Sequence, residues 1–484
     1  MSASRVIIGV HSSFWNNLES FAFHVPYFVG IVNLWRSPYL TVENHGGIFL
    51  ILYFFCLMLI AVPLYVCEAF IGLHTNRGRL GAWTLMPLMR GVGWASLHLA
   101  TFAMLSYLTI MAIGIIYLWH SFWNNLPWSQ YDNDWNTASC TKLDQFGNSS
   151  TSAITGLNYT SDALSQTQFL NNYVWRIPNV ESSFDGEFNW PMLYAFAAVF
   201  VLSMLNIKAA ASKSEVCIVG ACFLYILMVV LVVVGARLEG AAIGLRALFT
   251  FEWSLLMNPQ TWGDAMSQAL YSLGAGFLAL TALGRNSRSG HNFCISAFSL
   301  ALASVLTSLL MVVATYCVLG HLAYATGVAI SDVVQPGPGL VFQLIPIIMD
   351  HMYVPQLWCV VFFLVLIIVA QDNVFCEFTG LMTVVGDART IVDEAPCANR
   401  CCRVAIGLVF FILTIAPLSS VQAFYFFELI DSYRVIGFPL VFAGMLEVLA
   451  AGWFGQFHLK LHQTAGSRMA STIIYTVGNS LHQD

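Results

Sequence analysis

Residues 23–40 read FHVPYFVGIVNLWRSPYL, and this stretch decides the fold. It is apolar enough to lie in a membrane, yet Pro26 and Pro38 both disfavour an unbroken helix, and Asn33 and Arg36 are polar. Unpaired backbone groups are costly in hydrocarbon, so an interrupted span persists only where protein or a wet cavity covers it. Many secondary transporters build their sites from such interrupted helices at mid-membrane. The stretch therefore predicts a binding site and not a plain anchor.

The whole chain has the composition of a membrane protein. Of its 484 residues, 58% are hydrophobic and only 9% are charged, whereas soluble domains contain about 25% charged residues. This leaves room for no soluble domain larger than a loop, and no nucleic-acid partner is expected. The chain begins with only a short apolar run, so the first span is expected to act as its own insertion signal.

Ten apolar segments are long enough to cross a bilayer, at roughly 20 residues each. They centre near residues 18–40, 48–72, 93–121, 189–207, 215–236, 262–283, 293–322, 356–384, 403–422 and 434–456. Lys and Arg gather in alternate connections, which places those connections and both termini in the cytoplasm. The sequence thus predicts an all-α, multi-pass membrane protein surrounded by lipid.

The longest connection, residues 122–188, falls on the opposite side by the same charge argument. It is rich in Asn, Ser, Thr and Asp and carries two N-x-S/T sequons, at Asn148 and Asn158. A sequon alone is a weak signal, but two in one loop that faces outward predict an extracellular, glycosylated loop.

The ten spans divide into two sets of five, and the first span of each set is interrupted. Span six contains Gly274 and Gly276 where span one contains its prolines. Close helix packing is one explanation for glycine in a span. Interruptions at corresponding positions favour an inverted-repeat transporter with broken helices one and six. The predicted organisation is an N-terminus at 1–12, a first repeat at 13–237, a second repeat at 238–458 and a cytoplasmic tail at 459–484.

Several motifs resemble the neurotransmitter:sodium symporter family, solute carrier group 6. NLWRSPYL at 33–40 resembles the family's NVWRFPYL, and ENHGGIF at 43–49 resembles NGGGAF. ALYSLGAGF at 269–277 resembles the FFSL pattern of span six, and QDNVF at 371–375 resembles the LDSxF of span eight. The resemblance runs from about Trp15 to about Gln463.

This resemblance implies a sodium-coupled, chloride-assisted secondary symporter in the plasma membrane and not an enzyme. Gly30 stands where monoamine carriers have Asp, which favours the amino-acid or GABA-like branch, whose solutes bring their own carboxylate. The implied cargo is Na⁺, Cl⁻ and a small amino-acid-like solute. Whether the chain forms a homo-oligomer is left open.

The resemblance also implies roles for individual residues. Sodium is expected at Val29, Asn33, Ser272, Ser304, Val369, Asp372 and Asn373. Chloride is expected at Tyr53, Gln268, Ser272, Ser304 and Ser308. The solute is expected at Gly30, Tyr107, Tyr271, Phe277 and Glu377, below an outer gate of Arg36 with Asp431 and above an inner gate at Asp387. Oxygen ligands suit a hard cation, and hydroxyl and amide donors suit an anion.

Other interpretations of these residues stay open at this point. Tyr53 and Tyr107 are also what ordinary helix packing would use, and the three serines suit close helix contacts. Asp431 could be a solvated loop charge. Arg36 and Asp372 are harder to explain without a function, because ionisable groups inside spans are expensive.

Glu377 lies one helical turn after Asn373, where the family usually has a small residue beside the solute. A buried carboxylate needs a partner or a proton. One hypothesis pairs Glu377 with a cationic group of the solute. The alternative is a protonated side chain hydrogen-bonded to a neighbouring helix.

Some positions depart from the family pattern. Pro26 and Val32 replace glycines near the site, Ser304 replaces Asn, and the chain ends before two further spans. The Arg expected to pair with Asp387 reads His11 or Ser12. These departures support an alternative function, a transport-silent member that regulates or accompanies another membrane protein. An ion channel is disfavoured, because no ring of charged or carbonyl-rich repeats is visible.

Overall fold

The structure is a computed structural model of the chain. It describes residues 30–85, 87–138, 140, 164–177, 188–208, 213–287, 291–333, 337–388, 404–410, 412–413, 423–431 and 437–453. The predictions for Pro26, Val29, the inner-gate position at 11–12 and the sequons at Asn148 and Asn158 lie outside these residues.

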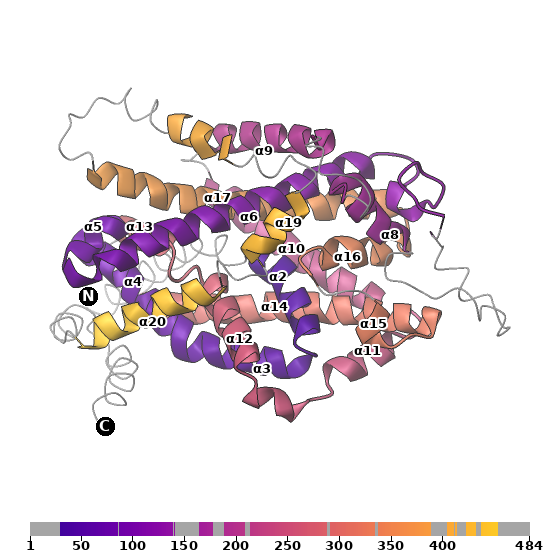
Figure 1. Ribbon diagram of the computed structural model, residues 1–484, viewed down its shortest axis with the longest axis horizontal. Helices are drawn as coiled ribbons and strands as arrows, with labels where there is room; N and C mark the ends of the chain where they lie inside the picture. Colours follow the sequence, from indigo (N-terminus) through magenta and orange to yellow (C-terminus); the bar gives the residue numbers. More distant parts are fainter. Residues whose placement is uncertain are drawn as a thin grey trace, which may run out of the picture.

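The described residues fold into a bundle of helices without a β-sheet (Figure 1). Three long helices run along its long axis: α6 (Arg90–Ser121), α14 (Phe293–Thr326) and α17 (Pro355–Ala388). They connect an end that carries α5 (Arg79–Ala82), called the α5 end, with an end that carries α8 (Ser165–Gln168), called the α8 end.

The remaining helices pack around these three. They are α2 (Ile31–Glu43), α3 (Gly47–Cys56), α4 (Val62–Thr75), α9 (Trp190–Lys208), α10 (Lys213–Gly235), α11 (Ala241–Leu248), α12 (Pro259–Ser272), α13 (Ala279–Asn286), α15 (Ile330–Val333), α16 (Leu340–Asp350), α19 (Ala423–Asp431) and α20 (Gly437–Trp453). Short 3₁₀ turns cover Trp83–Leu85, Pro87–Met89, Pro127–Ser129 and Trp253–Met257, and π-helical turns cover Leu57–Ala61 and Phe169–Val174.

Four predicted spans are confirmed as continuous apolar helices long enough to cross a membrane. They are Gly47–Thr75, Pro87–Ser121, Phe293–Thr326 and Pro355–Asp387. The first joins α3 and α4 through the π-helical turn Leu57–Ala61. Shorter apolar helices lie within the predicted spans four, five and ten, and only two pieces of span nine, 404–410 and 412–413, are described. The count of ten stays a prediction.

Span six is broken, as the sequence predicts. Helix α12 ends at Ser272 and α13 begins at Ala279. Between them Gly274 has φ +64° and Gly276 has φ +88°, left-handed conformations that glycine adopts without steric cost. A Cβ atom on Gly276 would also lie 2.6 Å from Leu440 Cδ1. The backbone conformation therefore favours glycine at this break, and a larger residue would also have to displace the end of the Leu440 side chain.

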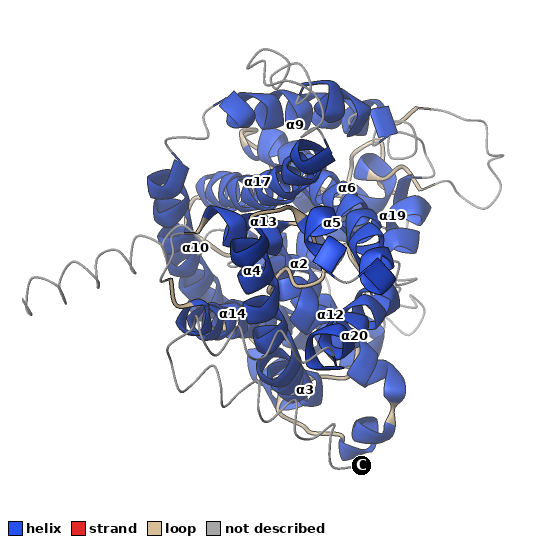
Figure 2. Ribbon diagram, turned by 90° about the vertical axis from the view of Figure 1, so that its left-hand side faces the viewer, coloured by secondary structure: helices blue, strands red, loops and turns tan. Residues whose placement is uncertain are grey.

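Span one behaves differently at its two ends. Gly30 is extended, with φ −79° and ψ 160°, and caps the start of α2. The expected interruption at Pro38 is wrong, because α2 continues through Pro38 to Glu43. A proline inside a helix removes one donor and strains one turn, and neighbouring helices can compensate for this loss. Helix α2 lies in the middle of the bundle, where α12, α14, α16 and α17 contact it (Figure 2).

Helix α13 packs tightly on α4. Cβ atoms on Gly72 and Gly284 would lie 2.1 Å from Thr281 O and 1.9 Å from Ala69 O, respectively. Small residues allow two membrane helices to approach this closely. The inner half of the broken span therefore forms a close pair with α4, while α6 packs along α17.

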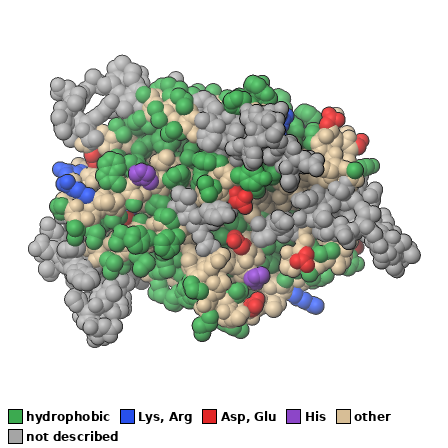
Figure 3. Space-filling view, in the orientation of Figure 1, with side chains coloured by type: hydrophobic (Ala, Val, Ile, Leu, Met, Phe, Trp, Pro, Cys, Tyr) green, Lys and Arg blue, Asp and Glu red, His purple; other side chains and the backbone are tan. Residues whose placement is uncertain are grey.

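The outer surface of the bundle is apolar. Large side chains such as Ile226, Leu306 and Phe442 are 62%, 48% and 54% exposed. Hydrophobic side chains cover much of the visible face in Figure 3. An apolar surface of this extent is typical of a protein embedded in lipid.

Candidate substrate and ion site

Three aromatic side chains line the break in span six. Tyr107 of α6 stacks on Tyr271 of α12 with ring centroids 5.8 Å apart, and Phe277 lies 5.3 Å from Tyr271. All three are buried. Tyr107 and Phe277 belong to separate elements, and Tyr271 contacts both of them. The predicted solute-binding aromatics are therefore brought together around the broken segment.

Arg36 of α2 contacts several side chains next to these aromatics. Its Nη1 donates to Gln268 Oε1 at 2.9 Å, and its guanidinium lies 5.6 Å from the centroid of the Tyr271 ring. It also contacts Ser267, with Nη1 3.4 Å from the hydroxyl oxygen. The side chain is only 2% exposed, so these contacts take the place of water.

Asp431 of α19 is the acidic partner of Arg36. Its Oδ1 lies 3.4 Å from Arg36 Nε, and Tyr39 donates a hydrogen bond to its other oxygen. The carboxylate is buried, so the interpretation as a solvated loop charge is wrong. Arg36 and Asp431, the predicted outer gate residues, are thus paired in this structure, and their role as a gate stays a prediction.

The predicted chloride group combines paired and unpaired donors. Tyr53 of α3 donates to Ser272 Oγ at 3.1 Å, so this tyrosine does more than pack. Gln268 Nε2 is a buried polar atom without a hydrogen-bond partner in the described part of the chain. Buried donors are nearly always paired, and an anion would pair this one. The residues present therefore fit a bound chloride.

The predicted sodium ligands that the structure describes lie on four helices, α2, α12, α14 and α17, with Ser272 at the end of α12. Asn33 on α2, Ser304 on α14 and Asn373 on α17 are all buried. Asp372 is half-buried, and α14 and α17 both pack directly on α2. Side-chain amides, hydroxyls and a carboxylate are the oxygen donors that a hard cation prefers.

Two carboxylates hold the backbone of the broken segment. Glu68 of α4 accepts a hydrogen bond from the Gly276 N–H at 2.7 Å. Glu377 of α17 accepts from the Leu278 N–H at 3.3 Å, directly before α13 begins. Acceptors at a helix N-terminus satisfy its unpaired donors and complement its dipole. The contact of Glu377 with a neighbouring segment is thus confirmed, and its role toward the solute stays a hypothesis.

Asp387 lies at the α5 end, where the inner gate is predicted. Its Oδ1 is 3.3 Å from Arg285 Nη1 of α13, and the Gly78 N–H donates to its Oδ2. The Arg285 and Asp387 side chains are 31% and 16% exposed, in contrast to the deeply buried outer pair. A basic partner for Asp387 therefore comes from the inner half of span six.

Comparisons with known proteins identify the family of the chain. A family model described as "Sodium:neurotransmitter symporter family" matches residues 13–477. The chain belongs to this family. Its members are membrane transporters, so the protein is a sodium-coupled symporter of small solutes and not an enzyme.

Several curated relatives of this symporter cover most of the chain. The sodium- and chloride-dependent creatine transporter 1 of Bos taurus is 31% identical over 89% of this chain and 68% of its own length. The sodium- and chloride-dependent betaine transporter of Caenorhabditis elegans is 30% identical over 93% and 75%. GABA transporter 2 of Mus musculus is 28% identical over 95% and 76%.

A solved structure confirms the transporter fold. The crystal structure of MhsT in complex with L-phenylalanine superposes with a TM-score of 0.72 at 19% identity. The superposition covers 96% of this chain and 94% of MhsT. At this identity the likeness concerns the fold alone.

Sequence reasoning missed three ionisable residues of the symporter. Arg79 Nη1 lies 3.2 Å from Glu68 Oε2, and Arg79 Nη2 contacts Glu447 of α20. All three side chains are at most 3% exposed. The rule that marked Asp372, that charges inside apolar spans are expensive, applies equally to Glu68 and Glu447 and would have found them.

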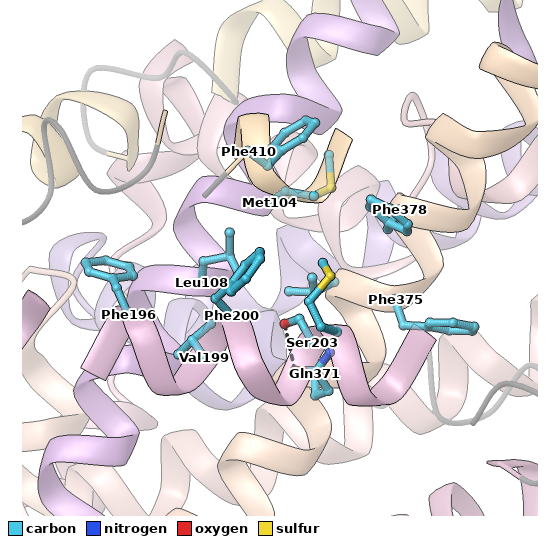
Figure 4. Close-up of a pocket in the computed structure, with 13 residues that line it drawn as sticks. Met104, Leu108, Phe196, Val199, Phe200, Ser203, Gln371, Phe375, Phe378 and Phe410 are labelled. Carbon is cyan, nitrogen blue, oxygen red and sulfur yellow. Dashed lines mark hydrogen bonds between the residues drawn. The ribbon is translucent and has the colours of Figure 1, made fainter. Parts of the chain in front are cut away.

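A cavity lies between α6, α9, α17 and residues 404–410 (Figure 4). Phenylalanines dominate its wall, and the one hydrogen bond drawn there joins Ser203 to Gln371 at 3.2 Å. None of its lining residues belongs to the predicted ion, solute or gate groups.

Proposed function

We propose that this symporter carries a small zwitterion, an amino acid or a GABA-like solute, into the cell with sodium and with the assistance of chloride. The observation that carries the proposal is the break at 273–278, placed between buried aromatics and below the Arg36–Asp431 pair. Interrupted helices at such a site expose backbone groups of both signs. A cation and a carboxylate need that combination.

Two helix ends, one from span six and one from span one, suit opposite charges. The C-terminal end of α12 presents carbonyl oxygens beside Ser272, which favours sodium. The N-terminal end of α2, next to Gly30, presents N–H groups, which favour the carboxylate of the solute. Asn33, on the first turn of α2, then lies between the cation and the anion.

Chloride is proposed at Tyr53, Gln268, Ser272, Ser304 and Ser308. The buried Gln268 Nε2, which has no hydrogen-bond partner among the described residues, supports this assignment. Gln268 also accepts from Arg36, so its amide orientation is set by the outer gate. Chloride binding and closure of the gate would then favour each other.

The solute class follows from the pocket and from the relatives. Creatine, betaine and GABA, which appear in the names of the relatives, each combine a carboxylate with a cationic group. The faces of Tyr107, Tyr271 and Phe277 attract cations, and Glu377 adds a carboxylate. We assign the cationic end of the solute to this side of the pocket, with Glu377 as its counter-charge.

The transport cycle uses the two gates in turn. Sodium stabilises the outward-open form, the solute completes the site, and Arg36 with Asp431 then closes over it. Release requires the α5 end to open, and this end faces the cytoplasm in the proposed orientation. The proposal includes ten spans as two inverted repeats, cytoplasmic termini, and a glycosylated outer loop with Asn148 and Asn158.

A transport-silent regulator is the second candidate. Val32 supports it, because its branched side chain is buried on the first turn of α2, where the solute carboxylate would approach. Ser304 supports it as well, since it is a shorter ligand than Asn.

An uptake measurement separates these functions. Cells expressing the full chain receive a radiolabelled panel of creatine, betaine, GABA and neutral amino acids, with sodium or chloride replaced in turn. Saturable uptake that requires sodium and weakens without chloride is expected, and Asp431→Asn should abolish it. No uptake by surface-expressed protein would favour the regulator, and current without solute would favour a channel.

A further inference from the structure

We propose that Arg79 and the segment 78–82, called the clasp loop, hold the α5 end of this symporter shut, and that inward release requires Arg79 to leave its partners. The inference rests on the proposed transport function. It goes beyond it by assigning an inner closing device to residues that no predicted site contains.

Arg79 ties together four parts of the bundle. Its Nη1 is 3.2 Å from Glu68 of α4, and its Nη2 contacts Glu447 of α20. Its Nε donates to Ser96 of α6 at 3.1 Å, and its guanidinium lies 5.8 Å from the centroid of the Trp83 ring. The planar guanidinium makes several such contacts at fixed angles, which a lysine would not reproduce.

The clasp loop also contacts α17. The Gly78 N–H donates to Asp387, and Asp387 pairs with Arg285 of α13. Helices α4 and α13 form one close pair, and α6 and α17 form another. The clasp loop therefore bridges the two pairs at the α5 end, where α13 must separate from α17 for a solute to leave the pocket.

The same contacts reach the solute pocket. Glu68, which pairs with Arg79, also holds the Gly276 N–H at 2.7 Å. Glu377, which accepts from Leu278, lies close enough to act on Arg79 electrostatically. Removing Arg79 would leave Glu68 and Glu447 as two buried carboxylates without their cation, and Glu68 would then turn toward water. Opening the α5 end and loosening the broken segment are therefore one event.

Hydrogen–deuterium exchange of the full chain in lipid nanodiscs tests the clasp without any transport. The readout is the amide exchange of peptides that cover residues 273–286 and 78–82. Arg79→Gln is compared with Arg77→Gln, a matched control, because Arg77 lies two residues away, is exposed, and donates from its guanidinium to Thr84. The double variant Arg79→Gln with Glu447→Gln restores the net charge of the cluster. It serves as a second test of the clasp in case Arg79→Gln alone does not fold.

Arg79→Gln should speed exchange in both peptides by at least about tenfold, and the double variant should stay fast although it folds. Arg77→Gln should match the native chain. Native exchange rates in the double variant would mean that Arg79 only neutralises charge, and the clasp would be rejected. Native rates in Arg79→Gln itself would reject it as well. Because the measurement needs no solute, an absence of uptake would overturn the proposed function and leave this result standing.

Discussion

Two buried arginines, Arg36 and Arg79, lie in the two proposed gates of this symporter, and their partners differ. Arg36 faces one carboxylate, Asp431, together with neutral groups and the Tyr271 ring. Arg79 faces two carboxylates, Glu68 and Glu447, and the Trp83 ring. Arg36 and Asp431 together carry no net charge. Arg79, Glu68 and Glu447 together carry one net negative charge, in a region that excludes water.

This difference predicts unequal costs of opening. Separating Arg36 from Asp431 leaves both groups near other polar partners that lie toward the outer face. Separating Arg79 from its partners exposes three charges at once, and it also disturbs the backbone at Gly276 through Glu68. The outer gate is therefore expected to open readily, and the inner end is expected to stay shut until sodium and the solute have bound and the outer gate has closed.

The largest effect should follow from Arg79→Gln. Breaking a buried ion pair from one side costs about 3–5 kcal/mol, because the remaining charge has no partner. Thermal unfolding in detergent should show a marked loss of stability, and adding Glu447→Gln should recover much of it. Equal stabilities of the single variant and the native chain would contradict the comparison.

Asp431→Asn should have the second-largest effect. Arg36 keeps Ser267, Gln268 and the Tyr271 ring as partners. The loss of unfolding free energy is therefore expected at the low end of the range for a broken buried ion pair, about 3 kcal/mol. Sodium-dependent uptake should fall at least about tenfold, because the outer gate no longer closes. Tyr39→Phe removes only the hydrogen bond to Asp431 and should retain most uptake. The idea fails if Asp431→Asn transports normally.

Gly276→Ala tests the broken segment with a smaller expected effect. Placing an L-residue in the left-handed region costs roughly 1–2 kcal/mol, and the new methyl group must also displace Leu440. The KM for the solute should rise more than the maximal rate falls. Gly386→Ala is the control, because a Cβ there meets nothing within 4 Å and φ is not positive.

Gln268→Ala should weaken chloride dependence. Losing one donor to an anion costs about 1.5 kcal/mol, so the chloride concentration for half-maximal uptake should rise roughly tenfold. Chloride titration of sodium-dependent uptake provides the measurement. Because Gln268 also accepts from Arg36, Ser308→Ala serves as a second variant that leaves the gate intact. Unchanged titrations in both variants would remove these residues from the chloride site.

Arg285→Gln should have the smallest effect on stability. The Arg285–Asp387 pair is partly exposed, and such pairs contribute about 0–1 kcal/mol. Thermal unfolding should shift little, although inward opening should become more frequent. A loss as large as that of Arg79→Gln would mean that the exposed pair, and not the buried cluster, closes the α5 end.

Sequence reasoning found the parts whose signal is local. The composition identified a membrane protein, and the glycines at 274 and 276 identified the break in span six. The motif at 33–40 marked Arg36 before any partner was visible. At Pro38 the local rule gave the wrong answer, because neighbouring helices stabilise a turn that an isolated chain would interrupt.

Sequence by itself determined the class of the protein, the place of the broken segment and the residues that face it, because apolar runs and glycines act through their immediate neighbours. Only the tertiary structure decided which charges meet. The family resemblance named Arg36 and Asp431 as partners, but nothing in the sequence connected Arg79 with Glu447, which is 368 residues away. No local pattern connects such residues. They pair because burial in an apolar bundle leaves each charge with no alternative partner in water, so the packing of the helices selects the partner.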